Sequence, residues 1–181
     1  MPASTIHPAL HFRAATLADR DALIALVTSA YRGETSRQGW TTEADLLDGP
    51  RIAPEVLEHD LTRPRSRVVV AGTPEMPLLA CAHVCDEGGA GYFGMFAVRP
   101  ERQGGGIGDA LLRECERIAR EEWQLPRMRM TVIDLREELI AWYERRGYRR
   151  TGIKKPFPYG DERFGRPRRQ DLRFEVLEKP L

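Results

Sequence analysis

A cluster of glycines between two apolar segments is the part of this sequence best suited to chemistry. The stretch VRPERQGGGIG, from Val98 to Gly108, lies between the apolar run 92–98 and the helix-like periodic run 107–123. Glycines let backbone N–H groups approach a ligand without a Cβ atom in the way, and the first turn of a following helix adds unpaired donors and a positive dipole end. A strand, a glycine turn and a helix start therefore predict an anion site of the kind that holds phosphates.

The spacing of the glycines excludes two common phosphate-binding motifs. A P-loop needs a lysine and a serine or threonine directly after its last glycine, and neither follows Gly108. The dinucleotide-binding pattern could begin at Gly104 and Gly106, but Asp109 then stands where its third glycine belongs. The pattern that remains is Gln103-x-x-Gly106-x-Gly108.

A second group of residues, Trp142-Tyr-Glu-Arg-Arg-Gly-Tyr148, runs from a helix end into a strand. Together with the glycine pattern and the preceding Phe96-Ala97-Val98-Arg99-Pro100, it resembles the two motifs of the GCN5-related N-acetyltransferase (GNAT) family, in the same order and at a suitable separation. Either motif alone is weak, but the pair is specific. The other predicted elements also fit the family, so the resemblance covers nearly the whole chain and implies acetyl-coenzyme A as the ligand.

The resemblance assigns the cofactor contacts residue by residue. It implies that the backbone of Phe96, Ala97 and Val98 pairs with the pantetheine arm as an added strand would, which requires the neighbouring strands to splay apart. It also implies that main-chain N–H groups hold the pyrophosphate along one continuous segment, made of Gln103, Gly104, Gly105, Gly106, Ile107, Gly108 and Asp109.

Tyr143 is the candidate catalytic residue. By resemblance it takes the position of the family's frequent general acid, the phenol that protonates the departing coenzyme A thiolate, and a phenol with a pKa of about 10 stays protonated at neutral pH. The alternative is that Tyr143 only packs beside Trp142. The same helix usually begins with an asparagine in this family, where this chain has Arg136, which either contacts a phosphate or is a solvated helix-start residue.

The sequence does not reveal a general base. Attack by an amine requires loss of a proton from an ammonium of pKa about 10.4, but the strand 92–98 carries no carboxylate. Glu34 and Glu43 lie where the family usually builds its acceptor pocket, and each is alternatively a solvated surface group. The resemblance implies that the main-chain N–H of Val98 stabilises the oxyanion.

Two segments are candidates for binding the acceptor. The run 31–40 combines polar groups, glycines and aromatics, as binding loops do, and offers Tyr31, Glu34 and Trp40, the last of which is alternatively a packing anchor. The segment 154–171 is basic with interleaved aromatics, but its acidic residues dilute the charge. It is predicted to be a lid over the acceptor site or a homodimer surface rather than a nucleic-acid patch.

Three functions follow from these residues. The first is an N-acetyltransferase that moves the acetyl group of acetyl-CoA to an amine of a small molecule or amino acid by direct attack in a ternary complex. The second is an acyl-CoA-binding sensor or interaction module without turnover. The third is a protein or peptide N-acetyltransferase, which ranks lower because no acidic groove suited to a basic tail is evident.

Composition restricts the partners and the compartment. The 28 basic residues nearly balance 27 acidic ones, so no global field favours nucleic acid or a membrane. The three cysteines, Cys81, Cys85 and Cys115, suit reduced core thiols in a cytoplasmic protein, and no set of residues is spaced to bind a metal. No signal peptide and no apolar run of membrane-spanning length is evident.

The surrounding elements are predicted to form one α/β domain over residues 1–181, since the chain is 181 residues long and 41% hydrophobic. Its cofactor core spans about 92–148, and its acceptor-side elements span about 31–61 and 154–171. We expect the GNAT fold, a mixed and mostly antiparallel sheet splayed at the coenzyme A strand, with about four helices.

Apolar patterns predict strands at 10–14, 68–71, 78–84, 92–98, 128–133, 149–153 and 172–177. Helices are predicted at 19–30, 54–61, 107–123 and 135–146, with a weaker helical region starting at Thr42.

Overall fold

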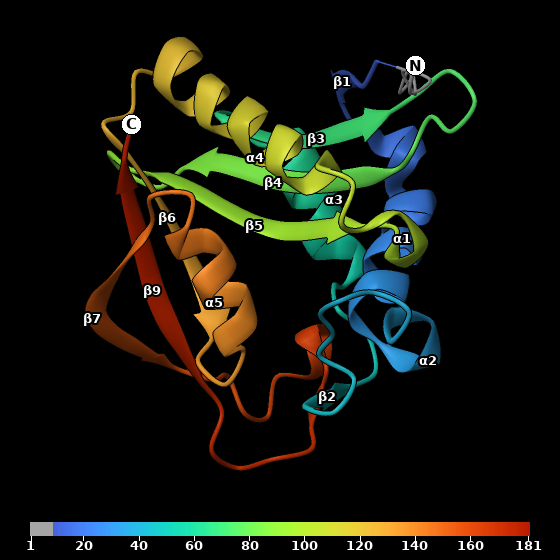
Figure 1. Cartoon of the computed structure of the whole chain (residues 1–181), viewed down its shortest axis with the longest axis vertical. Helices are drawn as coiled ribbons and strands as arrows, with labels where there is room; N and C mark the ends of the chain where they lie inside the picture. Colours follow the sequence, from blue (N-terminus) through green and yellow to red (C-terminus); the bar gives the residue numbers. More distant parts are fainter. Residues whose placement is uncertain (1–8) are drawn as a thin grey trace, which may run out of the picture.

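A computed structural model, which describes residues 9–181, contains one seven-stranded sheet with helices on both faces (Figure 1). Its strands are β1 (His11–Ala14), β3 (Ser66–Gly72), β4 (Ala80–Asp86), β5 (Gly91–Val98), β6 (Arg127–Ile133), β7 (Arg149–Pro156) and β9 (Arg173–Pro180). They lie in the order β1-β3-β4-β5-β6-β9-β7, and all neighbours are antiparallel except the parallel pair β5–β6. The predicted mixed, mostly antiparallel sheet is confirmed.

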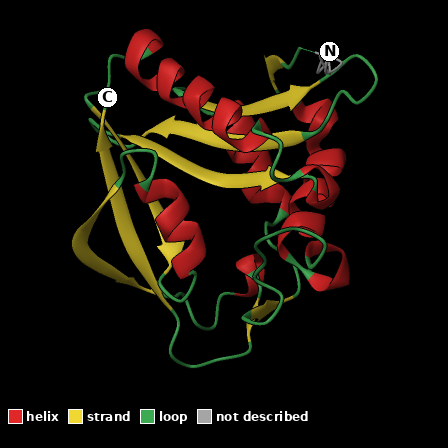
Figure 2. Cartoon of the chain, viewed as in Figure 1, coloured by secondary structure: helices red, strands yellow, loops and turns green. Residues whose placement is uncertain are grey.

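Residues 9–181 form five α-helices, most of which pack on this sheet. They are α1 (Arg20–Tyr31), α2 (Gly33–Ser36), α3 (Pro54–Thr62), α4 (Ile107–Arg117) and α5 (Glu137–Glu144). Successive side chains of a strand point to opposite faces of the sheet. On one face, Val69 and Ala71 of β3 join a core cluster with α4 and α5. On the other face, Val68 and Val70 join the cluster formed with α1 and α3. The helices therefore flank the sheet in two layers (Figure 2).

The sheet opens between β5 and β6, as the sequence predicted. These parallel strands pair only at Gly91 with Met128 and at Tyr92 with Arg129 in the described part of the chain. β5 also contains a bulge in the stretch that has separated from β6. Its register with β4 shifts next to Met95, whose φ is 47°. The edge of β5 that faces β6 is therefore free of strand partners from residue 93 to residue 98.

The helix that follows the glycine turn runs as predicted. α4 buries Leu111, Leu112 and Cys115 and continues as a π-helical turn, Ile118–Glu122, before the chain reaches β6. The prediction of a helical region starting at Thr42 is wrong. Instead the short α2 forms earlier, and the Thr42 hydroxyl holds the chain in a turn by bonding the Ser36 hydroxyl (2.5 Å) and accepting from the amide of Ala44 (3.0 Å).

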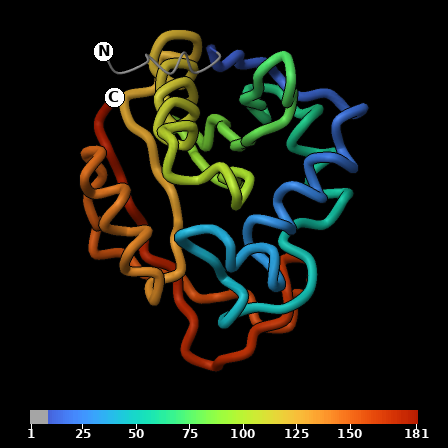
Figure 3. Tube along the Cα trace, turned by 45° about the vertical axis from the view of Figure 1, so that its right-hand side comes forward, coloured from blue at the N-terminus to red at the C-terminus, as the bar shows by residue number. Residues whose placement is uncertain are grey.

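Two segments distant in sequence meet at the end of the molecule beyond α5 (Figure 3). The small antiparallel sheet of β2 (Leu47–Asp48) and β8 (Arg166–Pro167) joins them, and the amide of Arg168 donates to the carbonyl of Leu46 at 2.8 Å. The regions 31–61 and 154–171, both expected on the acceptor side, are therefore in contact.

Candidate active site

The glycine turn forms the entrance to α4. Gly104 and Gly106 each have a φ of +84°, a conformation that glycine adopts without a Cβ penalty, and Gly106 is the N-cap of α4. Gly108 is required for a different reason, since a Cβ there would lie 2.9 Å from Cζ of Phe96 on β5. The glycines thus set the turn and let the helix start pack directly on the open strand.

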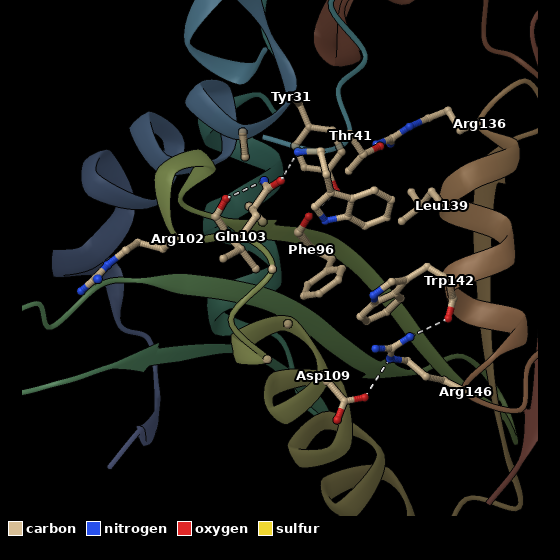
Figure 4. A pocket seen from close by; sticks show the side chains of 17 residues that line it. Tyr31, Thr41, Phe96, Arg102, Gln103, Asp109, Arg136, Leu139, Trp142 and Arg146 are labelled. Atoms are coloured by element: carbon tan, nitrogen blue, oxygen red, sulfur yellow. Dashed lines mark hydrogen bonds and ion pairs between the residues drawn. The ribbon is translucent and has the colours of Figure 1, made fainter. Parts of the chain in front are cut away.

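A cleft of about 160 Å³ lies against this turn (Figure 4). The predicted cofactor residues that line it are Phe96, Ala97, Val98, Gln103, Gly104, Gly106, Gly108 and Asp109. Gly105 and Ile107 are not part of its lining, and Ile107 instead packs against the main core. Trp142 of α5 and Arg146 in the turn after that helix close the opposite wall, so the cleft spans the gap between the two motifs.

The Gln103 side chain links three parts of this cleft. Its Nε2 donates to the carbonyl of Val98, and its Oε1 accepts from the amide of Trp40, both at 3.1 Å. Trp40 follows α2, so the glutamine ties the end of β5 to the predicted acceptor loop. Gln103 therefore has a structural role through its side chain, in addition to the pyrophosphate contact predicted for its main-chain N–H.

Asp109 places a carboxylate in the first turn of α4, where an anion is also expected to bind. Its two oxygens accept from Nε of Arg146 at 2.8 Å and pair with Nε of Arg113 at 3.0 Å. Arg146 in turn stacks on Trp142, with its guanidinium carbon 3.5 Å from the ring centroid. Because two arginines neutralise the carboxylate, Asp109 does not oppose a phosphate at the helix N-terminus.

A second cavity of about 270 Å³ lies on the other side of Phe96. The two cavities share the residues Tyr31, Phe96, Arg136 and Leu139. The two cavities are therefore neighbours that share part of their lining.

Tyr143 lines the second cavity from α5. Its ring packs among aromatic neighbours, 5.1 Å from Trp142 and 5.8 Å from Tyr148 between centroids, so the packing expected as the alternative is present. Burial raises the pKa of Tyr143 well above its usual value, and this phenol stays protonated across the neutral range. Both roles considered for Tyr143 remain compatible with this position.

The three predicted acceptor residues lie in different surroundings. Tyr31 is buried at the shared wall, and its hydroxyl donates to the carbonyl of Phe96. Trp40 lines the first cavity while staying partly exposed. Glu34 lines neither cavity, because its side chain is 91% exposed and pairs with Arg37 at 3.1 Å.

A buried charge cluster occupies one wall of the second cavity, and sequence reasoning missed it. Glu43 accepts from Arg32 at 2.5 Å and from Arg136 at 2.9 Å, and Nε of Arg51 lies 4.0 Å away. Burial alone would raise the pKa of Glu43, but Arg136, Arg51 and Arg32 together outweigh it and leave that pKa lowered. Glu43 is thus a permanent anion with its oxygens engaged, which makes it a poor base.

For Arg136 and for Glu43 the structure excludes one of the two alternatives, that of a solvated side chain, because both are buried. Arg136 also donates to the hydroxyl of Thr41 at 2.7 Å, which anchors the start of α5 to the acceptor loop. In the sequence, the charge of each residue was the local indication of such a cluster. The arginines around Glu43 come from three other segments of the chain, which local patterns do not bring together.

The C-terminal segment covers the second cavity. Phe157, Pro158 and Phe164 line it, and Arg32 donates to the carbonyl of Phe164 at 2.9 Å. The role of this segment as a lid stays a prediction. Within residues 9–181 no group of three or more metal-ligating side chains is found, and no helix is long and apolar enough to cross a bilayer.

Comparisons with known proteins agree with this architecture. Residues 64–150 match the family model described as an acetyltransferase (GNAT) domain, and no curated protein matches the chain. The structure is similar to the ribosomal-protein-S18-alanine N-acetyltransferase from Escherichia coli, with a TM-score of 0.68 and 15% identity over 95% of this chain and 94% of that one. It is also similar to a chimera of spermidine N-acetyltransferase SpeG from Vibrio cholerae and hSSAT (TM-score 0.67, 15% identity, 94% and 95% covered). Nourseothricin acetyltransferase is a third neighbour (TM-score 0.66, 20% identity, 95% and 98% covered). At these identities the likeness shows the fold alone.

Proposed function

The chain carries a GNAT acetyltransferase domain, and on that premise we propose that it is an N-acetyltransferase. It moves the acetyl group of acetyl-CoA to an amine of a small molecule or amino acid by direct attack in a ternary complex. The observation that carries this proposal is the wall shared by the two cavities, of which one lies at the glycine turn and the other contains Tyr143. Donor and acceptor bound in these cavities would be adjacent, which converts the transfer into a step within one complex.

The first cavity suits the pyrophosphate and the adjoining pantetheine part of the coenzyme. Unpaired N–H groups at the start of α4 and the positive end of its dipole suit a pyrophosphate, and the left-handed Gly104 and Gly106 leave open space where side chains would stand. The free edge of β5 from residue 93 to residue 98 suits the pantetheine amides. When bound, acetyl-CoA supplies an acyl group activated as a thioester.

Direct transfer is supported by the state of the cysteines. All three are buried, none lines either cavity, and burial raises the pKa of each thiol, to about 12 for Cys81. A thiol in that state is a poor acyl carrier. The amine nitrogen therefore attacks the acyl carbon itself, forming the N–C bond as the C–S bond breaks.

Two protons must move in this reaction. The acceptor ammonium must lose one, and the second cavity favours that loss because apolar walls and a surplus of arginine charge both lower the pKa of a bound ammonium. This explains how attack can proceed although Glu43 is engaged. The departing sulfur must gain a proton, and Tyr143, which is protonated and lines the same cavity, is the donor we assign.

A sensor that binds acyl-CoA without turnover is the second candidate. It is favoured by one observation: among residues 9–181, Glu43 is the only carboxylate that lines the second cavity, and its oxygens bind arginines. One experiment separates the two candidates. Thiol release from acetyl-CoA is measured with a panel of amines, amino acids and polyamines, alongside calorimetric binding of coenzyme A. Acceptor-dependent release supports the enzyme, binding with background release supports the sensor, and absence of both refutes both.

A further inference from the structure

The second cavity carries an unbalanced positive charge. Its lining includes three guanidiniums, from Arg32, Arg51 and Arg136, and one carboxylate, from Glu43. Arginine stays protonated in proteins, and the lowered pKa of Glu43 keeps it ionised, so the wall has a formal surplus of two positive charges. Uncompensated charge in a largely buried wall is costly, which makes the cavity a site for an anionic group.

The three arginines are not equivalent. The terminal nitrogens of Arg32 and Arg136 bind the protein itself, namely the two Glu43 oxygens, the Phe164 carbonyl and the Thr41 hydroxyl. Among the described residues, the Nε of each is buried without a hydrogen-bond partner and is out of a ligand's reach. Arg51 differs. Its nearest Glu43 distance is 4.0 Å, beyond a hydrogen bond, and its side chain is 25% exposed, against 5% and 7% for the other two. Arg51 is therefore the guanidinium whose donors can reach a ligand.

Arg51 is fixed close to the donor side. Its guanidinium carbon lies 4.8 Å from the ring centroid of Tyr31, and that of Arg136 lies 5.5 Å from the same ring. The Tyr31 hydroxyl binds the carbonyl of Phe96 at the wall shared with the donor cleft. A small ligand could thus bind Arg51 at one end and present another group to the shared wall at the other.

The remaining lining is almost entirely apolar. Its aromatic and aliphatic members come from the lid, β5, β6, α5 and β9, and include Tyr92, Met130, Val132, Phe157, Phe164 and Phe174. The volume of about 270 Å³ lies at the small end of ligand sites, which suits one compact molecule rather than a peptide chain. Nothing in this lining would compensate a second ammonium group.

We propose that the acceptor is an apolar amino acid whose carboxylate is bound by Arg51 while its amine faces the wall shared with the donor cleft. Arginine offers a planar pair of donors that matches a carboxylate, and the bound anion offsets part of the surplus charge. The aromatic lining buries the side chain. This inference rests on the proposed N-acetyltransferase function and names its substrate class.

The test compares acceptors that differ in one group. Acetylation is measured for phenylalanine, for phenylalaninamide and phenethylamine, which lack the carboxylate, and for spermidine, which is polycationic. Phenylalanylglycine separates a free amino acid from a peptide, and glutamate tests the need for an apolar side chain. Charge-assisted hydrogen bonds of this kind predict that kcat/KM for phenylalanine exceeds that of phenylalaninamide and of phenethylamine by about 10- to 100-fold. Equal values for acid and amide, or a preference for spermidine or the peptide, would overturn the assignment.

Substitution of Arg51 tests the residue. In Arg51→Gln the preference for phenylalanine over phenethylamine is expected to fall by about 10-fold or more, and Arg51→Lys, which keeps the charge but not the planar fork, should retain part of it. Arg127→Gln is the matched control, because that exposed arginine on β6 lines neither cavity and pairs with Glu178 at 3.5 Å. Thermal unfolding shows whether each variant is folded. An unchanged preference in a folded Arg51→Gln protein refutes the role of Arg51.

A binding measurement keeps the inference separate from the activity. Calorimetry on the coenzyme A-loaded protein compares N-acetylphenylalanine with N-acetylphenylalaninamide, and we expect the acid to bind at least about 10-fold more tightly. If no amine is acetylated but the acid still binds more tightly, the proposed function fails and the carboxylate site stands. If amines are acetylated but acid and amide bind alike, the inference fails and the proposed function stands.

Discussion

Replacing Gly106 by aspartate or asparagine separates charge from backbone strain at the proposed pyrophosphate site. Gly106 is the N-cap of α4 with a φ of +84°, and apart from its own chain neighbours no described residue comes within 4 Å of a Cβ added there. Asparagine and aspartate are the side chains that best tolerate this conformation, and both are good N-cap residues. The two variants have the same shape, so the difference in their coenzyme affinity reports the added negative charge.

The size of that difference follows from electrostatics in an open cleft. A carboxylate about 6 Å from each of the two phosphate charges is disfavoured by about 1.4 kcal/mol per charge at an effective dielectric constant of about 40. Together this is about 3 kcal/mol, which is roughly a 100-fold weaker affinity for the aspartate variant. At about 1 M salt the Debye length falls to about 3 Å, so most of the difference should vanish.

Calorimetric titration with coenzyme A at low and high salt measures both effects. Gly88 provides the matched control, since it also has a positive φ of +75° with open space around an added Cβ, but it lines neither cavity. Its aspartate and asparagine variants should bind coenzyme A equally. If the two folded Gly106 variants also bind equally at low salt, the pyrophosphate does not lie at this helix start and the reasoning is refuted.

Three further predictions concern a proton donor, a buried ion cluster and a buried histidine. Tyr143→Phe should lower kcat by about 100-fold and leave coenzyme A affinity within about twofold, and a parallel loss of both would show that the phenol is structural. Because burial raises the pKa of Tyr143, wild-type turnover should not fall through loss of its proton up to about pH 10. Glu43→Gln leaves three arginines without a carboxylate and should lower the free energy of unfolding, measured in urea, by about 3–5 kcal/mol. The control Glu34→Gln, at an exposed side chain, should change it by no more than about 0.5 kcal/mol. Similar values for both variants would contradict a stabilising cluster. Burial lowers the pKa of His83 from 6.5 to about 4, so on acidification the unfolded chain binds the proton before the folded chain does. The contribution of His83 to the free energy of unfolding is therefore fully present above about pH 6.5. It should fall by about 3 kcal/mol as the pH drops to about 4. Chemical unfolding across this range should show a flatter profile for His83→Gln, and an identical slope would exclude His83 as the cause.

Much of the donor side could be read from local sequence patterns. A continuous apolar run predicts β5, helical periodicity predicts α4, and the glycines between them fix the turn, because each pattern is set by the conformation of a few consecutive residues. The splay of β5 from β6 was expected from the family resemblance and is present. The helix expected from Thr42 failed because a side-chain hydrogen bond to Ser36 formed a turn instead, which depends on α2 standing nearby.

What the sequence alone determined is the order of the elements, the glycine turn and the resemblance that names the donor. Tertiary structure decided the acceptor side. Arg32, Glu43, Arg51 and Arg136 look like ordinary surface charges in sequence, yet they converge from four segments on one buried wall. Backbone patterns are local, but the net charge of a cavity is a sum over residues that only the folded chain brings together, and our proposal for the acceptor rests on that sum.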